Sequence, residues 1–240
     1  MNYQRYQSKM IMREHILKIM QPYVSKMWQH PFNKALCDGS LPFNIFQDFL
    51  EQDKIYLNVL AKSLTMIASR LEQTDHTVLF TNLSNYIKQT EMHLHEKYLE
   101  TKNINFFKQA RQETQMINSI QNYTKHIKAQ ADNANVISAV ASTLPCFYLY
   151  SDLGEKIKSE SIERYNRYYK WLLSYTSHDF NNYSENILNT ISIMSDQLNE
   201  SQKNEMLSVI KKSASLEIAF WNNFLLEKED NTPITRRIIK

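Results

Sequence analysis

Glycine is nearly absent from this chain: the 240 residues include only Gly39 and Gly154. Glycine is the default residue wherever the backbone takes a positive φ, so tight β-hairpins and the phosphate-binding loops of nucleotide-binding folds depend on it. Neither GxGxxG nor GxxxxGK[ST] occurs. Two glycines leave almost no room for a sheet-rich or nucleotide-binding fold. The sequence therefore predicts an all-α protein with short connections.

The length and the charge of the chain further restrict the class of protein to which it can belong. A chain of 240 residues without a low-complexity linker is expected to form a single domain, residues 1–240. The net charge is +3 with both signs interspersed, and the one basic cluster, Arg236, Arg237 and Lys240, lies in the tail, so no nucleic-acid partner is predicted. No apolar run reaches the length of a membrane span. Two cysteines make no disulfide framework, which favours a reducing, cytoplasmic location.

Apolar residues recur with helical spacing over most of the chain. Pro31 interrupts the first helical segment, Gly39 suits a helix C-cap, and Ser40 and Pro42 suit the start of the next helix. Asp132-Asn133-Ala134-Asn135 is expected to form a break and a cap before one helical segment, and Ser177-His178-Asp179 a capping break before another. The predicted helical segments cover residues of about 8–36, 42–71, 77–99, 107–130, 136–158, 162–175, 180–199 and 202–228, with a connection at 103–106 and an extended tail after about 230. This pattern predicts a multi-helix bundle, in which sites form between facing helices.

One of the two cysteines follows a proline inside a helical segment. Pro145 and Cys146 lie within an apolar and aromatic run, and Tyr150 follows Cys146 by one helical turn. Proline in a helix interior removes a hydrogen bond and costs about 3 kcal/mol or more. A thiol at such a position is typical of a functional site, whereas most free cysteines are small buried hydrophobes. Both interpretations of Cys146 remain open at this point.

Four helical segments carry two chemically capable residues one turn apart, so that each pair shares a helix face. For Asp53 the alternative is an exposed ion pair with Lys54, but Asp53 lies beside an apolar stripe, which favours burial. Glu217 lies among apolar residues, and a buried carboxylate needs a partner or a raised pKa, as functional sites provide. Any single tyrosine is more often a packing residue. The pairs are Asp53 with Tyr56, Glu91 with His95, Cys146 with Tyr150, and Glu217 with Phe220; Tyr123 and Tyr175 are single phenols.

The pair Glu91 and His95 raises a metal hypothesis, because a carboxylate and an imidazole one turn apart can ligate iron or manganese in a bundle. A two-metal site would need a second such set on a facing helix. Asp152 and Glu155 have no histidine at the required spacing, and His178 and Asp179 are adjacent. No metal site is predicted.

Four motifs occur in a fixed order along the chain. They are His30-Pro31-Phe32 followed by Asp38-Gly39-Ser40-Leu41-Pro42; Gln52-Asp53 with Tyr56-Leu57; Leu144-Pro145-Cys146 through Tyr150 to Gly154-Glu155-Lys156; and Glu217 with Phe220-Trp221. Tyr123-Thr124, and Trp171 with Tyr175, fall between these motifs at compatible spacing. In their order and spacing the motifs resemble the TenA (thiaminase II) family, the aminopyrimidine aminohydrolases of thiamin salvage, over about residues 25 to 225.

The resemblance implies a fold and a set of residue roles. The fold is an all-α bundle like haem oxygenase but without haem, assembled as a homotetramer. Cys146 matches the family's nucleophile, Asp53 the aspartate that holds the pyrimidine, and Glu217 the proton shuttle. The expected substrate-binding residues are Tyr56, His95, Tyr123, Tyr150, Tyr175 and Phe220.

The implied activity is that of a hydrolase acting on C–N bonds. Water would replace the aminomethyl nitrogen of 4-amino-5-aminomethyl-2-methylpyrimidine, giving the hydroxymethyl pyrimidine and ammonia, and thiamin itself is a second substrate of such enzymes. No metal or organic cofactor is required. Two alternatives stay open, because a fold alone does not determine function. One is a non-catalytic pyrimidine-binding or regulatory protein, and the other, less favoured, is a metal-dependent oxidase.

Overall fold

A computed structural model describes residues 3–100, 116–133, 135–159, 162 and 164–224. All regular secondary structure in these ranges is helical, which confirms the predicted all-α class. The elements are α1 (Tyr3–Gln29), α2 (Pro31–Asp38), α3 (Phe43–Arg70), α4 (Thr74–Tyr86), η1 (Ile87–Glu91), α5 (Met92–Glu100), α6 (Asn118–Asn133), α7 (Val136–Ser159), α8 (Tyr169–Ser174), α9 (His178–Met194), η2 (Ser195–Gln197), α10 (Glu200–Trp221) and η3 (Asn222–Phe224).

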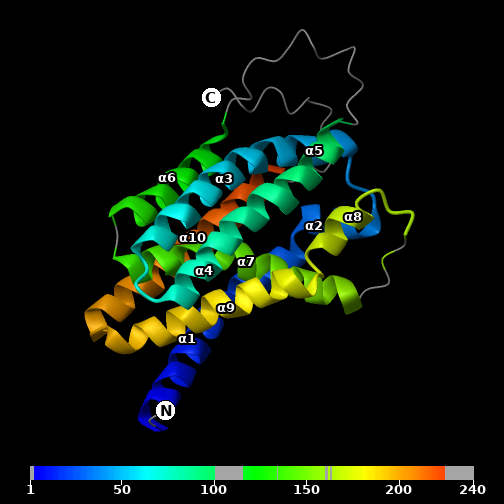
Figure 1. Ribbon diagram of the computed structural model, residues 1–240. Coiled ribbons are helices and arrows are strands. Elements are labelled where there is room, and N and C mark those ends of the chain that lie inside the picture. The colour runs from blue at the N-terminus through cyan, green and yellow to red at the C-terminus, as the bar shows by residue number, and fades with distance from the viewer. Residues whose placement is uncertain (1–2, 101–115, 134, 160–161, 163, 225–240) are drawn as a thin grey trace.

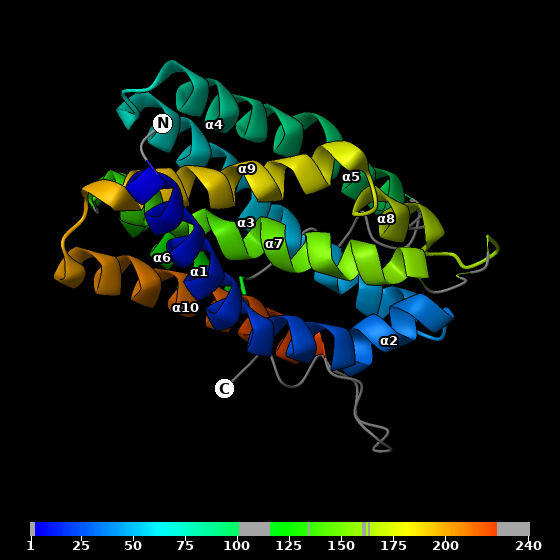
Figure 2. The same ribbon diagram turned by 90° about the horizontal axis from the view of Figure 1, so that it is seen from below.

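The longer helices pack into a bundle around α3, α7 and α10 (Figures 1 and 2). α6 contacts all three of these helices, α4 covers α3, and α9 covers α7. α1 crosses α7, α9 and α10, and its N-terminal part extends beyond the rest of the bundle in Figure 1. The interior between α3, α7 and α10 is the place where side chains from distant parts of the sequence meet.

An aromatic cluster centred on Phe49 of α3 joins four elements. The Phe49 ring lies 4.7 Å from Trp221 and 5.1 Å from Phe32, measured between ring centroids, and 5.9 Å from Trp171. All four side chains are fully buried. Aromatic pairs in this distance range contribute about 0.5–1.5 kcal/mol each beyond the area they bury. The cluster therefore fixes α2, α8 and α10 against α3.

Helix caps account for most of the predicted boundaries. Asn135 accepts a hydrogen bond from the backbone N–H of Ile137, and Ser177 accepts one from Phe180, so both predicted caps are confirmed. Gly39 has φ +79° at the end of α2, as a C-cap requires.

The prediction for Ser40 was wrong, because Pro42 occupies the N-cap position of α3 and makes no side-chain cap bond. The backbone N–H of Ser40 instead donates to Asp38 Oδ1.

The predicted helix over 162–175 was also wrong, because α8 covers only Tyr169–Ser174. The side chain of Asn166 explains the difference. Its Nδ2 donates to the carbonyl oxygens of Leu36 and Cys37, and its Oδ1 accepts from the Tyr168 N–H. These tertiary bonds hold residues around 166 in a non-helical turn.

Three predictions lie outside the described residues. They are the connection at 103–106, the first part of the 107–130 helix and the extended tail after 230.

α7 contradicts the prediction that no apolar run is long enough to span a membrane. By length and composition this helix could cross a membrane, since its most apolar window has a mean hydropathy of 1.2. The core helices of soluble proteins satisfy the same criterion, and 78% of this window is buried inside the bundle. Its apolar character thus corresponds to its central position in the fold.

Gly154 of α7 permits a close backbone approach. A Cβ atom at this position would lie 2.0 Å from the carbonyl oxygen of Tyr175, at the end of α8. Backbone cannot move aside as the end of a flexible side chain can. The absence of a side chain at 154 therefore lets Tyr175 approach α7.

We expect Gly154→Ala to lower the free energy of unfolding by about 2–3 kcal/mol, because forced overpacking costs about 1–3 kcal/mol and here the clash is with backbone. Thermal denaturation followed by circular dichroism measures the effect, which corresponds to a Tm lower by about 5–10 °C. Gly39→Ala is the control, with a loss of about 1 kcal/mol from its positive φ alone. Equal Tm values for the Gly154→Ala variant and the parent protein would contradict the close approach.

Candidate active site

A small cavity lies in the middle of the bundle, between α3, η1, α7 and α10. The volume open to the centre of a water molecule is about 10 Å³, which is room for about one water molecule. A ring-sized ligand therefore requires the wall side chains to move. The residues that line it are Asp53, Tyr56, Leu57, Glu91, Cys146, Phe147, Tyr150, Tyr175, Phe180 and Glu217.

A larger cavity of about 520 Å³ lies between α1, α2 and residues 162 and 165–167. Its charged residues Lys34, Asp38 and Arg167 are exposed. Buried acidic groups are typical of functional sites, and the small cavity is the one that buries them. We therefore place the candidate site in the small cavity.

α7 brings Cys146 and Tyr150 to the cavity from one helix face, as their four-residue spacing predicts. Pro145 lies inside this helix, also as predicted. The Cys146 side chain is 8% exposed. Burial raises the pKa of its thiol well above the ordinary value, and the nearby Glu217 and Glu91 raise it further, whereas Tyr56 opposes the change. The thiol is thus protonated near neutral pH.

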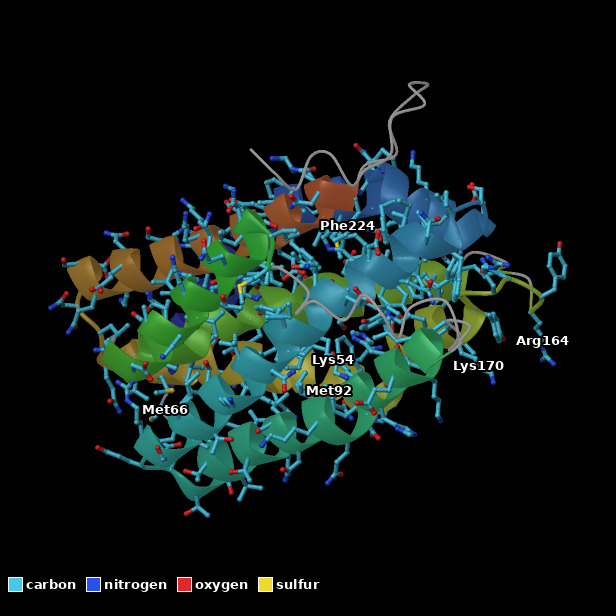
Figure 3. The ribbon with its side chains drawn as sticks, turned by 90° about the horizontal axis from the view of Figure 1, so that it is seen from above. Lys54, Met66, Met92, Arg164, Lys170 and Phe224 are labelled. Carbon is cyan, nitrogen blue, oxygen red and sulfur yellow. The ribbon has the colours of Figure 1, made fainter. Side chains whose placement is uncertain are left out.

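Asp53 of α3 faces His95 of α5 across a distance of 3.5 Å from Oδ2 to Nε2. Burial, with a smaller contribution from Lys54, lowers the pKa of His95 to about 3, so the imidazole is neutral. Burial, followed by the charges of Glu217 and Glu91, raises the pKa of Asp53 well above its usual range. Figure 3 labels Lys54, which follows Asp53 on α3, and Met92, the first residue of α5; the two helices are in contact.

Glu217 of α10 lies among polar side-chain groups of Tyr123, Tyr150 and Trp221. Burial raises the pKa of this carboxyl to about 7, and these three groups oppose the shift. Its Oε2 nevertheless lacks a hydrogen bond of standard geometry within the described part of the chain, as do the Tyr56 and Tyr123 hydroxyls. A carboxyl of this kind can gain or lose a proton near neutral pH.

Glu91 lines the cavity although it was not among the predicted site residues, and the same holds for the apolar Leu57, Phe147 and Phe180. Glu91 ends η1, a π-helical turn between α4 and α5, and π turns within α-helices are frequent at functional sites. Its side chain is 8% exposed, and burial, with the charge of Glu217, raises its pKa to about 8. The only sequence signal for Glu91 was its four-residue spacing from His95. That spacing predicted that the two side chains share a helix face, but not which other residues this face would meet.

Aromatic rings form the walls. Tyr56 stacks on Tyr123 of α6 with centroids 4.3 Å apart, and Tyr150 lies 4.8 Å from Tyr175. Tyr56, Tyr150 and Tyr175 line the cavity directly. Phenyl and phenol faces at these positions suit a flat heterocyclic ligand.

Three residues proposed from the family resemblance lie outside the lining. Tyr123 lies behind Tyr56, and His95 lies behind Asp53. Phe220 stacks on Phe49 at 5.1 Å, in the aromatic cluster. Their effect on a ligand would act through these neighbours.

Glu91 and His95 are the pair for which the sequence raised the metal hypothesis. Among the described residues, no group of three or more His, Cys, Asp or Glu side chains is arranged to hold a metal ion. His95 is directed to Asp53 instead.

The fold and the cavity define a class: an all-helical bundle with a buried thiol and three carboxyl groups around a small aromatic-walled cavity. The chain belongs to the TENA/THI-4/PQQC family, whose sequence model matches residues 17–227. This match confirms the family prediction.

Known relatives extend over nearly the same length. The chain is 23% identical over 203 residues to an aminopyrimidine aminohydrolase of Halalkalibacterium halodurans, covering 84% of this chain and 90% of the relative. It is 26% identical over 192 residues to the aminopyrimidine aminohydrolase of Bacillus subtilis, covering 80% of each. A crystal structure from Silicibacter, described as a TenA family transcription regulator, is similar with a TM-score of 0.76 at 19% identity, covering 92% of this chain and 97% of that one.

The raised pKa of Glu217 predicts how stability depends on pH. The folded pKa of about 7 exceeds the ordinary value of 4.5, so the folded state binds this proton more tightly. This stabilising effect is fully present below pH 4.5 and is lost as the pH rises through 7. We expect Glu217→Gln to be more stable than the parent protein at pH 8 by about 3 kcal/mol, with little difference at pH 4.

Thermal denaturation at the two pH values measures this difference. Glu205→Gln makes the same chemical change at an exposed position of α10 and should leave both Tm values unchanged. If Glu217→Gln were less stable than the parent protein at pH 8, Glu217 would be an ionised, stabilising group.

Proposed function

We propose that the protein is an aminopyrimidine aminohydrolase of thiamin salvage, which converts 4-amino-5-aminomethyl-2-methylpyrimidine to the hydroxymethyl pyrimidine and ammonia. The observation that carries the proposal is the convergence of Cys146, Asp53 and Glu217 on one aromatic-walled cavity. The names of the relatives and the family membership support the same reaction.

The first chemical step is addition of the Cys146 thiolate to the ring carbon next to the 5-substituent. A C–S bond forms, and the ring nitrogen takes a proton from Asp53. Thiolates are strong nucleophiles even when only a fraction of the thiol is ionised. The thiol proton passes to Asp53, which is close enough to affect the Cys146 pKa, and from Asp53 to the ring nitrogen, so Glu217 keeps its own proton for the next step.

Departure of the amine is the second step. The electrons of the adduct expel the nitrogen as the C–N bond breaks, Glu217 supplies the proton, and ammonia leaves an exocyclic methylene carbon. Water then adds to this carbon and returns a proton to Glu217. Loss of the ring proton to Asp53 and cleavage of the C–S bond restore the aromatic ring and the thiolate. A carboxyl with a pKa of about 7 suits both proton transfers.

Cys146→Ser should reduce turnover by about 10³-fold or more, because a serine hydroxyl is a far weaker nucleophile at this position. The binding of the pyrimidine should stay within a few-fold of that of the parent protein, since the substitution is nearly isosteric. Ammonia release and calorimetric titration measure the two quantities. The half-buried Cys37 supplies the matched control, Cys37→Ser, which should retain full turnover. Turnover near the parent rate in Cys146→Ser would exclude the nucleophile role.

Glu217→Gln should lower kcat/KM by about 10²–10⁴-fold, the usual contribution of general acid–base catalysis. The parent protein should lose activity as the pH rises through about 7, where Glu217 loses its proton. This alkaline decrease should be absent from the variant's profile of residual activity between pH 5 and 9. An identical pH profile in Glu217→Gln would assign the proton transfer to another group.

A second candidate function is regulation through pyrimidine binding without turnover. The description of the Silicibacter structure as a transcription regulator favours considering it. A buried thiol and three carboxyl groups directed at one cavity exceed what a binding protein needs. Mass spectrometry of products, after incubation with aminomethyl pyrimidine and with thiamin side by side, separates catalysis from binding alone. The same products distinguish hydrolysis from an oxidase reaction.

We also propose the remaining expectations from the sequence: a single domain over residues 1–240, a homotetramer, and a cytoplasmic protein without nucleic-acid or membrane partners. Both cysteines are free thiols, which suits a reducing compartment. Met10 and Ile11 of α1 are 45% and 66% exposed, and large exposed apolar side chains of this kind suit burial in an assembly.

A further inference from the structure

One carboxyl group of the cavity has no role in the reaction described above. Glu91 lines the cavity, is more than nine-tenths buried, and makes no hydrogen bond or ion pair within the part of the chain that the structure describes. Asp53 by contrast faces His95, and Glu217 lies among Tyr123, Tyr150 and Trp221. Among the described residues, the fully covered oxygen atoms without a partner include Glu217 Oε2 but neither oxygen of Glu91, so the Glu91 carboxyl opens onto the cavity, where a ligand can reach it.

The surroundings of Glu91 indicate the chemistry of that ligand. The described residues that line the cavity include three carboxyl groups and no lysine or arginine. Five of the lining residues are aromatic: Tyr56, Phe147, Tyr150, Tyr175 and Phe180. Carboxylates combined with aromatic faces form the usual environment for an amine or another cationic group. The cavity therefore favours a ligand that carries a positive charge or several N–H donors.

The three carboxyl groups lie close to one another. The charges of Glu217 and Glu91 both raise the pKa of Asp53, and that of Glu217 raises the pKa of Glu91. Under the proposed function Asp53 holds the pyrimidine ring and Glu217 reaches the departing nitrogen. Glu91 is then a neighbour of the same nitrogen, approaching it from η1 and not from α10.

We propose that Glu91 accepts N–H groups of the 5-aminomethyl nitrogen and so selects primary-amine pyrimidines as substrates. This inference rests on the proposed function and specifies its substrate class. An aminomethyl nitrogen retains N–H donors whether or not it carries the proton shared with Glu217. The corresponding nitrogen of thiamin belongs to a thiazolium ring and has no N–H. Glu91 thus discriminates the salvage substrate from intact thiamin.

Binding measurements test this selectivity without turnover. Cys146→Ser serves as the parent, and Glu91→Gln is added to it. The two ligands are 4-amino-5-aminomethyl-2-methylpyrimidine and 4-amino-2,5-dimethylpyrimidine, which carries a methyl group in place of the aminomethyl group. Glu96→Gln, an exposed glutamate paired with Lys54 on α5, is the matched control.

We expect Glu91→Gln to raise the Kd of the aminomethyl pyrimidine by about 10–100-fold, the usual effect of losing a charge-assisted hydrogen bond. The Kd of the dimethylpyrimidine should change by less than about threefold, and Glu96→Gln should change neither value. Equal weakening of both ligands would assign Glu91 a structural role and overturn the proposal. Unchanged binding of the aminomethyl pyrimidine would overturn it as well.

The proposed function is tested separately, by product analysis of the wild-type protein. If the wild-type protein forms product and Glu91→Gln shows no selective loss, only the role of Glu91 fails. If neither pyrimidine binds the wild-type protein or Cys146→Ser, both proposals fail together.

Discussion

The shared burial of four acidic groups is the constraint on which this structure depends. Asp53, Glu91, Cys146 and Glu217 line one cavity that holds about one water molecule. Burial disfavours the charge on each group, and each charge disfavours the others. The folded protein therefore keeps protons on several of them near neutral pH, at a cost to stability relative to apolar side chains. That same condition supplies the proton donors that the proposed reaction needs.

The surrounding packing has to offset this cost, and it also sets the geometry. The four groups come from four elements, α3, η1, α7 and α10, so the cavity exists only when the bundle is assembled. The aromatic cluster around Phe49 holds α10 and α8 to α3. Gly154 allows the backbone of Tyr175 to approach α7, which brings its phenol to the cavity. Stability and site geometry thus rest on the same contacts.

The sequence patterns predicted those features of the fold that interactions between nearby residues determine. Caps at Asn135 and Ser177, the helix through Pro145 and the shared face of Cys146 and Tyr150 follow from bonds within a few residues. The non-helical turn at Asn166 follows from bonds to residues about 130 positions away, and helical periodicity contains no trace of them. The residue pairs predicted shared helix faces, and the family resemblance predicted which faces meet.

Glu91 shows where periodic patterns stop being informative. Between η1 and α5 the Met92 N–H bonds to the Ile87 carbonyl, five residues earlier, so the helix gains one residue in this turn. A 3.6-residue period assigned across residues 77–99 is therefore out of phase on one side of it. His95 is neutral and brings no positive charge to the side of Asp53, so the cavity's preference for a positive or N–H-rich ligand comes from its own lining. The buried acidic groups that cost stability are thereby the groups that set the ligand preference.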